Sequence, residues 1–414
     1  MSFFGSRWVE RPAHVSELEP TALPAGFRAA GVAAAIKPSG LDVGVLVNDG
    51  PDRASAARFT ASALLGAPVV VSKEAALDRL RAALVSSGNA NVADGERGLE
   101  TARAAQARAA VELGIEPAEV GIAATGVIGR ELPREPLLAG IARAVAELGP
   151  DARSFSEAML TTDRGPKRAC LAVELPTGTV RLAAQAKGAG MMAPRFATML
   201  CFVQTDAALS SATLDLLTGV TVGRSFERIS VDGQLSTSDT VLCLASGASG
   251  ARVEPESDAE LRLGEALDAL LRQLALAIVA DGEGSERVGR VVVHGAPHLV
   301  EPVARAVADS PLVKTALHGA DPNFGRILQA AGQALAEHDP GGGFYVDLEV
   351  EGRALVVAGE RLDVAAEEWR ALERAVERDE VEYALSVPGE GGEAEVFFSD
   401  LSPGYVSLNA DYTT

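Results

Sequence analysis

Short apolar runs typical of buried strands alternate with longer stretches of helical periodicity, and this alternation limits the possible folds more than any other feature. Buried strands are predicted at residues 40–48, 67–72, 180–184, 288–294 and 344–351. Helices are predicted at residues 99–113, 135–148, 258–279, 297–310 and 364–378. Because the two kinds are interleaved and no repeat recurs at a fixed period, the sequence predicts an α/β or mixed α+β class.

Turn-rich stretches interrupt this pattern around Gly165 (DRGPK), at residues 247–258 (GASGARVEPESD) and at residues 341–343, the three glycines of HDPGGG. The last two are typical of loops rather than of linkers between domains. A chain of 414 residues with 47% hydrophobic composition can bury at least one sizeable core, and its length suggests roughly two or three domains.

The formal net charge of −20 excludes some classes of partner. Such a surface repels nucleic acids and anionic membranes but attracts a cationic small molecule. No apolar run approaches the length of a membrane span, and Arg7 and Glu10 stand where a signal peptide needs an apolar core. The three cysteines are too scattered for a disulfide framework or a CxxC metal site. We therefore expect a cytoplasmic protein that binds small molecules.

Several short stretches allow both a functional interpretation and a purely structural one. KGAG at 187–190, GASG at 247–250 and DGEG at 281–284 could cradle a phosphate, but none matches a P-loop or a dinucleotide fingerprint, so ordinary turns are favoured. The histidines lack metal-ligand spacing and a nearby nucleophile motif, and are interpreted as structural or surface residues: His14, His294, His298, His318 and His338. No G-x-S-x-G elbow supports a serine hydrolase.

Thr198 lies in the segment KGAGMMAPRFATMLCF, residues 187–202, whose glycines break a helix and whose Pro194 breaks both helix and strand. A threonine hydroxyl is a poor nucleophile and no partnered histidine is evident here. If the bond after Ala197 is cut, the freed α-amino group, with a pKa of about 7.7 to 8.0, can act as the base for its own hydroxyl. The residues alone leave open the alternative that Thr198 is an ordinary strand residue.

The segment KGAGMMAPRFATML resembles the autocleavage segment of the ornithine acetyltransferase family, the ArgJ-type glutamate N-acetyltransferases of arginine biosynthesis. Other blocks resemble the family in the same order and run almost from end to end. They are GFRAAGVAAAIKPSG from Gly26, SGNAN at 87–91, ATGVIGRELP from Ala124, LTTD at 160–163, RISVDGQLSTSDTVL from Arg228, DGEG at 281–284, SPLVKTALHGADPNFGRI from Ser310, and LNADYTT from Leu408.

The resemblance implies self-cleavage between Ala197 and Thr198. An α chain of residues 1–197 would then accompany a β chain of residues 198–414 that begins with the nucleophile Thr198. The family's oxyanion pair falls on Thr125 and Gly126, whose hydroxyl and N–H suit the charge that grows on a carbonyl oxygen during acyl transfer.

The family's substrate contacts fall on Thr161, Lys187, Thr198, Glu283, Asn409 and Thr414, although Thr162 beside Thr161 leaves that register open. Lys187 can pair with a substrate carboxylate, and Glu283 can hold the cationic amine of ornithine. The residues alone also allow plainer roles, with Glu283 in a turn and Asn409 and Thr414 in a frayed chain end.

The resemblance implies a two-step acetyl transfer from N2-acetylornithine to glutamate through an acetyl-Thr198 ester, with no metal and no bound organic cofactor. Some members also accept acetyl-CoA, and no feature of this sequence separates the two kinds. The implied fold is a layered α/β sandwich of the ornithine acetyltransferase and DmpA aminopeptidase type. The implied assembly is a heterotetramer of two α and two β chains.

Two alternatives stay open. One is an amidohydrolase or aminopeptidase that uses the same Thr198 but passes the acyl group to water, or a specialised paralogue in secondary metabolism. The paralogue is mildly favoured by Arg195 and Phe196, which depart from an Asn-Met-like pair in the family. The other is a binding protein that keeps the fold and never cleaves.

Overall fold

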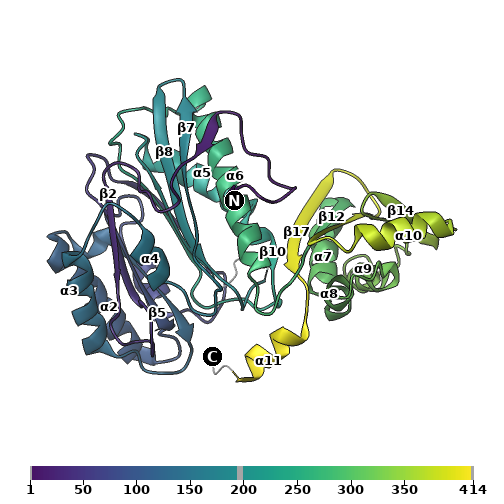
Figure 1. Ribbon diagram of the computed structural model, residues 1–414, viewed down its shortest axis with the longest axis horizontal. Coiled ribbons are helices and arrows are strands. Elements are labelled where there is room, and N and C mark those ends of the chain that lie inside the picture. The colour runs from purple at the N-terminus through teal and green to yellow at the C-terminus, as the bar shows by residue number, and fades with distance from the viewer. Residues whose placement is uncertain (1, 194–198, 412–414) are drawn as a thin grey trace.

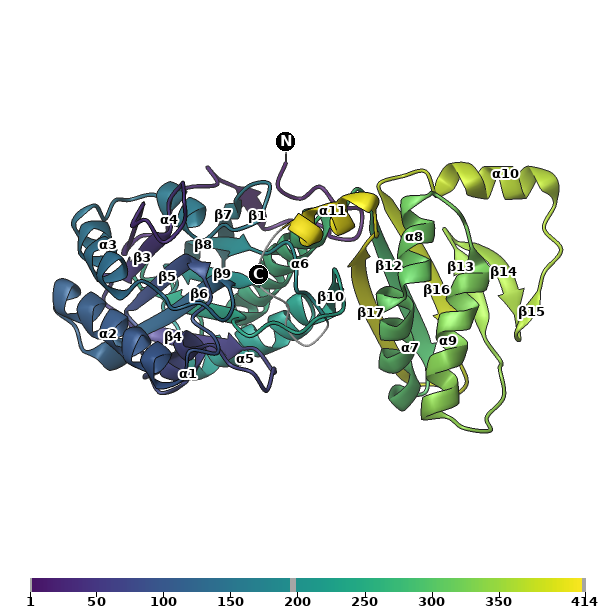
Figure 2. The same cartoon turned by 90° about the horizontal axis from the view of Figure 1, so that it is seen from below.

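The structure, a computed structural model, describes residues 2–193 and 199–411. The described chain forms a main body and a smaller second lobe, which lie side by side in Figures 1 and 2. Two sheets build the main body, and a third sheet with its helices builds the lobe. The C-terminal helix α11 (Pro403–Asp411) extends from the lobe back toward the main body.

A six-stranded sheet lies at the centre of the main body. Its strands, in spatial order, are β1 (Val15–Glu17), β7 (Lys167–Leu175), β8 (Gly178–Lys187), β9 (Leu200–Thr205), β11 (Thr240–Ala245) and β4 (Ala54–Phe59). Neighbours are antiparallel except β9 and β11, which run parallel. Since Lys187 pairs with Leu200, residues 188–199 connect two neighbouring strands of this sheet.

A four-stranded sheet packs against it. Its strands are β2 (Phe27–Val32), β3 (Val43–Asn48), β5 (Ala82–Asn89) and β6 (Val120–Val127), and β5 and β6 run parallel. The parallel pair is joined by α2 (Gly95–Leu113), the crossover helix that such a connection needs. The Thr125-Gly126 pair that the sequence singled out lies in the last three residues of β6.

Alternating side chains on β9 show how the layers are held together. Leu200 and Phe202 join the core between the two sheets, whereas Cys201 and Val203 point to the opposite face and join the core beneath the helices. This is the period-two alternation of a strand, here buried on both faces. The main body is therefore a four-layer sandwich of helices, sheet, sheet and helices.

Helices cover both outer faces of the sandwich. Helices α2 and α3 (Arg134–Ala146) cover the four-stranded sheet, whereas α5 (Ser211–Gly223) and α6 (Asp258–Ala280) cover the six-stranded one (Figure 1). Helix α6 begins where the Ser257 hydroxyl accepts the Glu260 N–H, a favourable N-cap. The short helices α1 (Ala67–Lys73) and α4 (Arg153–Ala158) and the 3₁₀ turns η1 (Pro117–Glu119) and η2 (Phe226–Arg228) complete the main body.

The lobe is a seven-stranded sheet with helices packed on it. In spatial order its strands are β10 (Ile229–Ser230), β17 (Gly392–Ser399), β12 (Val288–Gly295), β16 (Glu380–Ser386), β13 (Asp347–Val350), β14 (Arg353–Val357) and β15 (Glu360–Arg361). The helices are α7 (Pro297–Asp309), α8 (Pro311–His318), α9 (Phe324–His338) and α10 (Ala366–Ala375). Strand β10, at the edge of this sheet, directly follows η2 of the main body, so its pairing with β17 ties the lobe to the main body.

The mixed α/β class and the layered arrangement predicted from the sequence are confirmed. One element is wrong: residues 67–72 were expected to form a strand and instead lie in α1. Pro68 occupies the first turn, where it needs no N–H donor, and Val69 and Val71 are buried. A short apolar run does not distinguish a buried helix from a strand. Residues 344–351 hold a shorter strand than expected, β13, which begins only at Asp347.

Candidate active site

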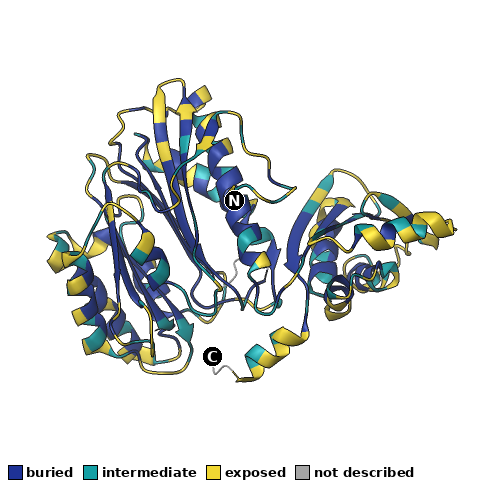
Figure 3. Cartoon of the chain, viewed as in Figure 1, coloured by how far each residue is buried: buried dark blue, intermediate teal, exposed yellow. Residues whose placement is uncertain are grey.

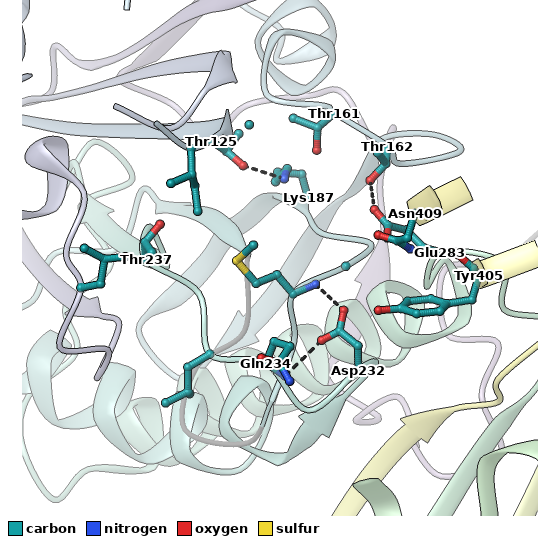
Figure 4. A pocket seen from close by; sticks show the side chains of 16 residues that line it. Thr125, Thr161, Thr162, Lys187, Asp232, Gln234, Thr237, Glu283, Tyr405 and Asn409 are labelled. Atoms are coloured by element: carbon teal, nitrogen blue, oxygen red, sulfur yellow. Dashed lines mark hydrogen bonds between the residues drawn. The ribbon is translucent and has the colours of Figure 1, made fainter. Parts of the chain in front are cut away.

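A cavity of about 400 Å³ opens where β6 and β8 end, and loops from both halves of the chain line it (Figure 4). The loops that follow α4, β10 and α6 form its walls, and α11 closes one side. The lining residues are Leu64, Thr125, Gly126, Ile128, Thr161, Thr162, Lys187, Gly190, Met191, Asp232, Gln234, Leu235, Thr237, Glu283, Tyr405 and Asn409.

Lys187, the last residue of β8, is a buried cation that reaches the end of β6. Its Nζ donates a hydrogen bond to Thr125 Oγ1 over 2.9 Å (Figure 4), and the residue is only 2% exposed. Burial lowers the pKa of Lys187, although the nearby Asp163 opposes that shift. Since the Thr125 oxygen accepts this bond, its own proton is left for another acceptor in the cavity.

Asp163 supplies a negative charge that favours the charged form of Lys187. Its Oδ1 accepts the Gly188 N–H and a Lys167 Nζ donor, both over 2.7 Å. Burial acts to raise the pKa of this carboxyl, but the charges of Lys187 and Lys167 outweigh burial and lower the pKa to about 2. The carboxylate is therefore ionised at neutral pH and compensates the buried lysines.

Gly126 follows Thr125 at a position that excludes a side chain. Its φ of +126° is rarely adopted by other residues, and a Cβ there would lie 2.4 Å from the carbonyl carbon of Gly88 on β5. The two strands approach this closely because glycine faces glycine in the parallel pair. The predicted oxyanion pair therefore lies on a rigid strand end beside Lys187.

Glu283 forms the opposite pole of the cavity. Its Oε1 accepts the Thr162 hydroxyl over 2.8 Å, and its Oε2 accepts the Asn409 amide over 2.9 Å (Figure 4). Gly190 makes room for this carboxylate, because a Cβ there would lie 2.6 Å from Glu283 Cδ. Of the two candidate threonines, Thr162 contacts Glu283, whereas Thr161 lines the wall.

Asp232 and Tyr405 also line the cavity, although the sequence analysis did not single them out. Asp232 accepts the N–H groups of Met191 and Met192 over 2.7 and 2.8 Å. Tyr405 lies beside Asp232 and Glu283, and burial, with these two carboxylates, raises its pKa to about 12. The sequence signal for Asp232 was its position as a polar residue within RISVDGQLSTSDTVL, a block that resembles the family.

Six of the predicted site residues meet in this one cavity: Thr125, Gly126, Thr161, Lys187, Glu283 and Asn409. They come from positions almost 300 residues apart in the sequence and from five different segments of the chain. The remaining predictions, Ala197, Thr198 and Thr414, lie outside the described residues. The residues on either side of 194–198 are described, and Met191 and Gly190 upstream line the cavity.

The described residues contain no cluster that could hold a metal ion and no exposed thiol. No group of three or more His, Cys, Asp or Glu side chains among residues 2–193 and 199–411 is placed to hold a metal ion. The three cysteines, Cys170, Cys201 and Cys243, are buried and unbonded, and burial raises the pKa of each thiol. No helix in the same residues is long and apolar enough to cross a membrane.

Comparison with known proteins identifies the family. The ArgJ family matches residues 28–414. This chain belongs to the ArgJ family. It is 41% identical over 399 residues to the arginine biosynthesis bifunctional protein ArgJ of Symbiobacterium thermophilum, a match that covers 94% of this chain and 98% of the relative. The corresponding protein of Streptococcus thermophilus is 35% identical, with 95% and 98% covered.

Among solved structures, the ornithine acetyltransferase of Mycobacterium tuberculosis complexed with ornithine is 35% identical, with a TM-score of 0.41. That match covers 45% of this chain and 99% of the solved chain. The ArgJ family predicted from the sequence is confirmed, and with it the acyltransferase class of this ArgJ-family chain.

Proposed function

We propose that this ArgJ-family chain transfers the acetyl group of N2-acetylornithine to glutamate through an acetyl ester on Thr198. The observation that carries the proposal is the convergence of Thr125, Lys187 and Glu283 in one cavity beside the connection that contains Thr198. One end of the cavity offers donors for an oxyanion, and the other offers a carboxylate for a substrate ammonium. Acetyl transfer from N2-acetylornithine requires both kinds of group.

The nucleophile is generated by cleavage between Ala197 and Thr198. Cleavage there would leave β8 at the end of an α chain of residues 1–197 and β9 near the start of a β chain of residues 198–414. Since β8 and β9 are hydrogen-bonded from Leu182↔Thr205 to Lys187↔Leu200, both chains would remain in one sheet. The freed α-amine of Thr198 then serves as the base for its own hydroxyl.

In the first half-reaction, Thr198 Oγ attacks the acetyl carbonyl of N2-acetylornithine while its α-amine takes the hydroxyl proton. The Thr125 hydroxyl and the Gly126 N–H stabilise the oxyanion, with Lys187 polarising Thr125. The C–N bond breaks, the proton passes to the departing amine, and ornithine leaves. An acetyl ester remains on Thr198.

Glu283 and its neighbours bind the substrate side chain. The carboxylate holds the second, cationic amine of ornithine, while Thr162 and Asn409 keep its two oxygens oriented. An acetyl donor whose side chain lacks that positive charge would leave the Glu283 carboxylate unpaired and bind poorly. Lys187, Thr161 and Thr414 are proposed as contacts for the substrate carboxylate and backbone.

In the second half-reaction, the amine of glutamate attacks the ester and carries the acetyl group away, which regenerates Thr198. No residue in the described chain decides whether acetyl-CoA can also load the enzyme. The proposed assembly is a cytoplasmic heterotetramer of two α and two β chains, with small molecules as its only partners.

An amidohydrolase with the same nucleophile is the competing function, and the fate of the acetyl group separates the two. The enzyme is incubated with N2-acetylornithine labelled in its acetyl group, with or without glutamate, and products are measured by mass spectrometry. We expect labelled N-acetylglutamate when glutamate is present and none with Thr198→Ala. Labelled acetate released at the same rate with and without glutamate would refute the transferase and support the hydrolase.

A further inference from the structure

A buried aspartate outside the proposed machinery touches the chain right next to the nucleophile. Asp239, which directly precedes β11, is 0% exposed, and its Oδ1 accepts the N–H of Met199 over 3.0 Å. The neighbouring Thr240 N–H donates to the Met199 carbonyl over 3.2 Å. Both backbone groups of Met199 are therefore held by the start of β11.

The same loop also holds the upstream side of the connection. The N–H groups of Met191 and Met192 bind Asp232, and the Met192 carbonyl accepts the N–H groups of Val231 and Gly233 over 3.0 Å each. Residues 231–240 thus hold both described ends of the segment that contains the proposed cleavage site. On the upstream side the carboxylate faces the cavity, whereas on the downstream side it is fully enclosed.

The Asp239 carboxyl is enclosed together with the buried hydroxyl side chains of Thr60 and Ser236. Among residues 2–193 and 199–411, its Oδ2 is buried and has no hydrogen-bond partner. Burial raises the pKa of Asp239 well above its usual range, although the Met199 N–H, the Ser236 hydroxyl, the charge of Lys187 and the Thr60 hydroxyl oppose the shift.

Covalent geometry brings this carboxyl close to the nucleophile. Residue 198 is bonded to Met199, and consecutive Cα atoms lie about 3.8 Å apart. A group that fixes the Met199 N–H therefore fixes the peptide plane that begins at Thr198. Lys187, the cation that polarises Thr125, also acts on the Asp239 carboxyl from the end of β8, on the far side of β9.

We propose that Asp239 is a positioning residue for the nucleophile: by holding the Met199 N–H, it orients Thr198 both for cleavage after Ala197 and for acetyl transfer. The inference rests on the proposed function and adds a residue to it. Misplacing a reacting group by about 1 Å can cost about 100-fold in rate. Loss of Asp239 should therefore lower kcat and slow cleavage, while substrate binding at Glu283 is left intact.

The test compares Asp239→Ala with Asp239→Asn. The amide oxygen of asparagine can still accept the Met199 N–H, whereas alanine cannot. We expect Asp239→Ala to slow cleavage and kcat about 100-fold with KM for N2-acetylornithine near the wild-type value. Asp239→Asn should restore most of both rates. If the alanine variant does not fold, Asp239→Leu, which fills the volume without accepting the bond, takes its place.

Asp206 provides a matched control at the other end of β9. It is also buried and accepts two backbone N–H groups, from Arg181 over 2.7 Å and from Ala25 over 3.2 Å. Six strand residues, roughly 20 Å, separate it from Met199. Asp206→Ala should lower the melting temperature but leave cleavage and kcat close to those of the wild type.

Two results would overturn the proposal. One is Asp239→Ala that cleaves and turns over at wild-type rates, and the other is Asp239→Asn that folds but loses as much rate as the alanine variant. The wild-type enzyme is measured in parallel. If it neither cleaves nor forms N-acetylglutamate, the proposed function itself fails, which is a different outcome from either of these.

Discussion

Lys187 and Thr125 are placed together by the ends of two strands, and their contact decides what Thr125 can do. Because Lys187 donates to the Thr125 oxygen, the hydroxyl proton is left to stabilise negative charge in the cavity. This arrangement resembles an oxyanion donor whose acidity is increased by a neighbouring cation. The cation itself is stabilised by Asp163.

Thr125→Val removes the hydroxyl at nearly constant volume. We expect kcat for acetyl transfer to fall about 100- to 1000-fold, because one oxyanion donor is lost. Thr125→Ser keeps the hydroxyl and should retain most of the activity. Steady-state kinetics with N2-acetylornithine and glutamate measure both variants, and a valine variant with wild-type kcat would exclude Thr125 from the oxyanion hole.

Asp163→Asn tests the charge balance under Lys187. The pKa of Asp163, about 2, lies below the ordinary aspartate value of 3.8, so this carboxyl contributes about 2 kcal/mol of stability at pH 7. A depressed pKa gives stability that is present above the unfolded pKa and is lost as pH falls through the folded pKa. Urea unfolding should therefore show a wild-type advantage at pH 7 that shrinks between about pH 4 and pH 2. An advantage that stays constant with pH would contradict this role.

Single residues of the site were predictable from sequence only where they fall within distinctive motifs. Lys187, Glu283 and the Thr125-Gly126 pair were found in this way. Asp163 and Asp239 lay inside quoted motifs but received no role, because their function depends on burial beside Lys187 and Met199. Burial and pairing of charges arise from tertiary contacts, which a single sequence does not display.

Helix α11 shows how one element can serve the site without serving the core. No residue of this helix is buried, as its exposed surface in Figure 3 shows, yet Tyr405 and Asn409 line the cavity. The helix is attached where Ser402 Oγ donates to the Gly284 carbonyl over 2.6 Å, next to Glu283. Helix α11 therefore closes the cavity on the side of Glu283.

A chain that stops after Ser402 should fold but bind its substrate weakly. Deletion of α11 removes no buried side chain, so the melting temperature should change little. Loss of the Asn409 contact to Glu283 should raise KM for N2-acetylornithine about 10-fold or more. A truncated enzyme with unchanged KM would show that α11 plays no part in binding, and thermal unfolding provides the control for folding.

At the scale of elements, long patterns were predictable and short ones were not. Helix α6 matches its predicted span because 23 residues of apolar periodicity and a Ser257 cap all specify a helix. Helix α1 was mistaken for a strand because its seven residues are too few to show a period. The loops that form the site follow no period, so their meeting could be expected only from family resemblance.

The lobe is joined to the main body through a buried cluster of charges around Glu395. This carboxylate on β17 contacts Arg272 of α6 over 2.9 Å and Arg228 of η2 over 3.5 Å, both in the main body. Arg290 of β12 pairs with it over 2.5 Å from within the lobe. Burial acts to raise the pKa of Glu395, but its hydrogen bonds to Arg272 and the arginine charges lower it.

Glu395→Gln leaves three arginines without their shared anion. We expect the free energy of unfolding to fall by about 3 to 5 kcal/mol, the usual result of breaking a buried ion pair. Glu382→Gln is the control, since Glu382 pairs with Arg290 over 2.7 Å at a site that is 33% exposed, and should cost less than about 1 kcal/mol. Urea unfolding measures both, and equal losses would show that the cluster does not join the lobes.

At the scale of the whole molecule, the sandwich can accommodate the proposed cut between Ala197 and Thr198. Strands β8 and β9 are paired on either side of the proposed cut, so the proposed β chain would supply Glu283 and Asn409 to a cavity that also holds Thr125 and Lys187 of the proposed α chain. The proposed acetyl transfer therefore depends on cleavage between Ala197 and Thr198. Without it, Thr198 has no α-amine and the proposed chemistry cannot begin.

The most direct test is the intact mass of freshly purified protein under denaturing conditions, before and after N2-acetylornithine is added. We predict two chains, one ending at Ala197 and the other beginning at Thr198, with only the second gaining one acetyl group. A single chain of 42.7 kDa that persists through long incubation would contradict the account.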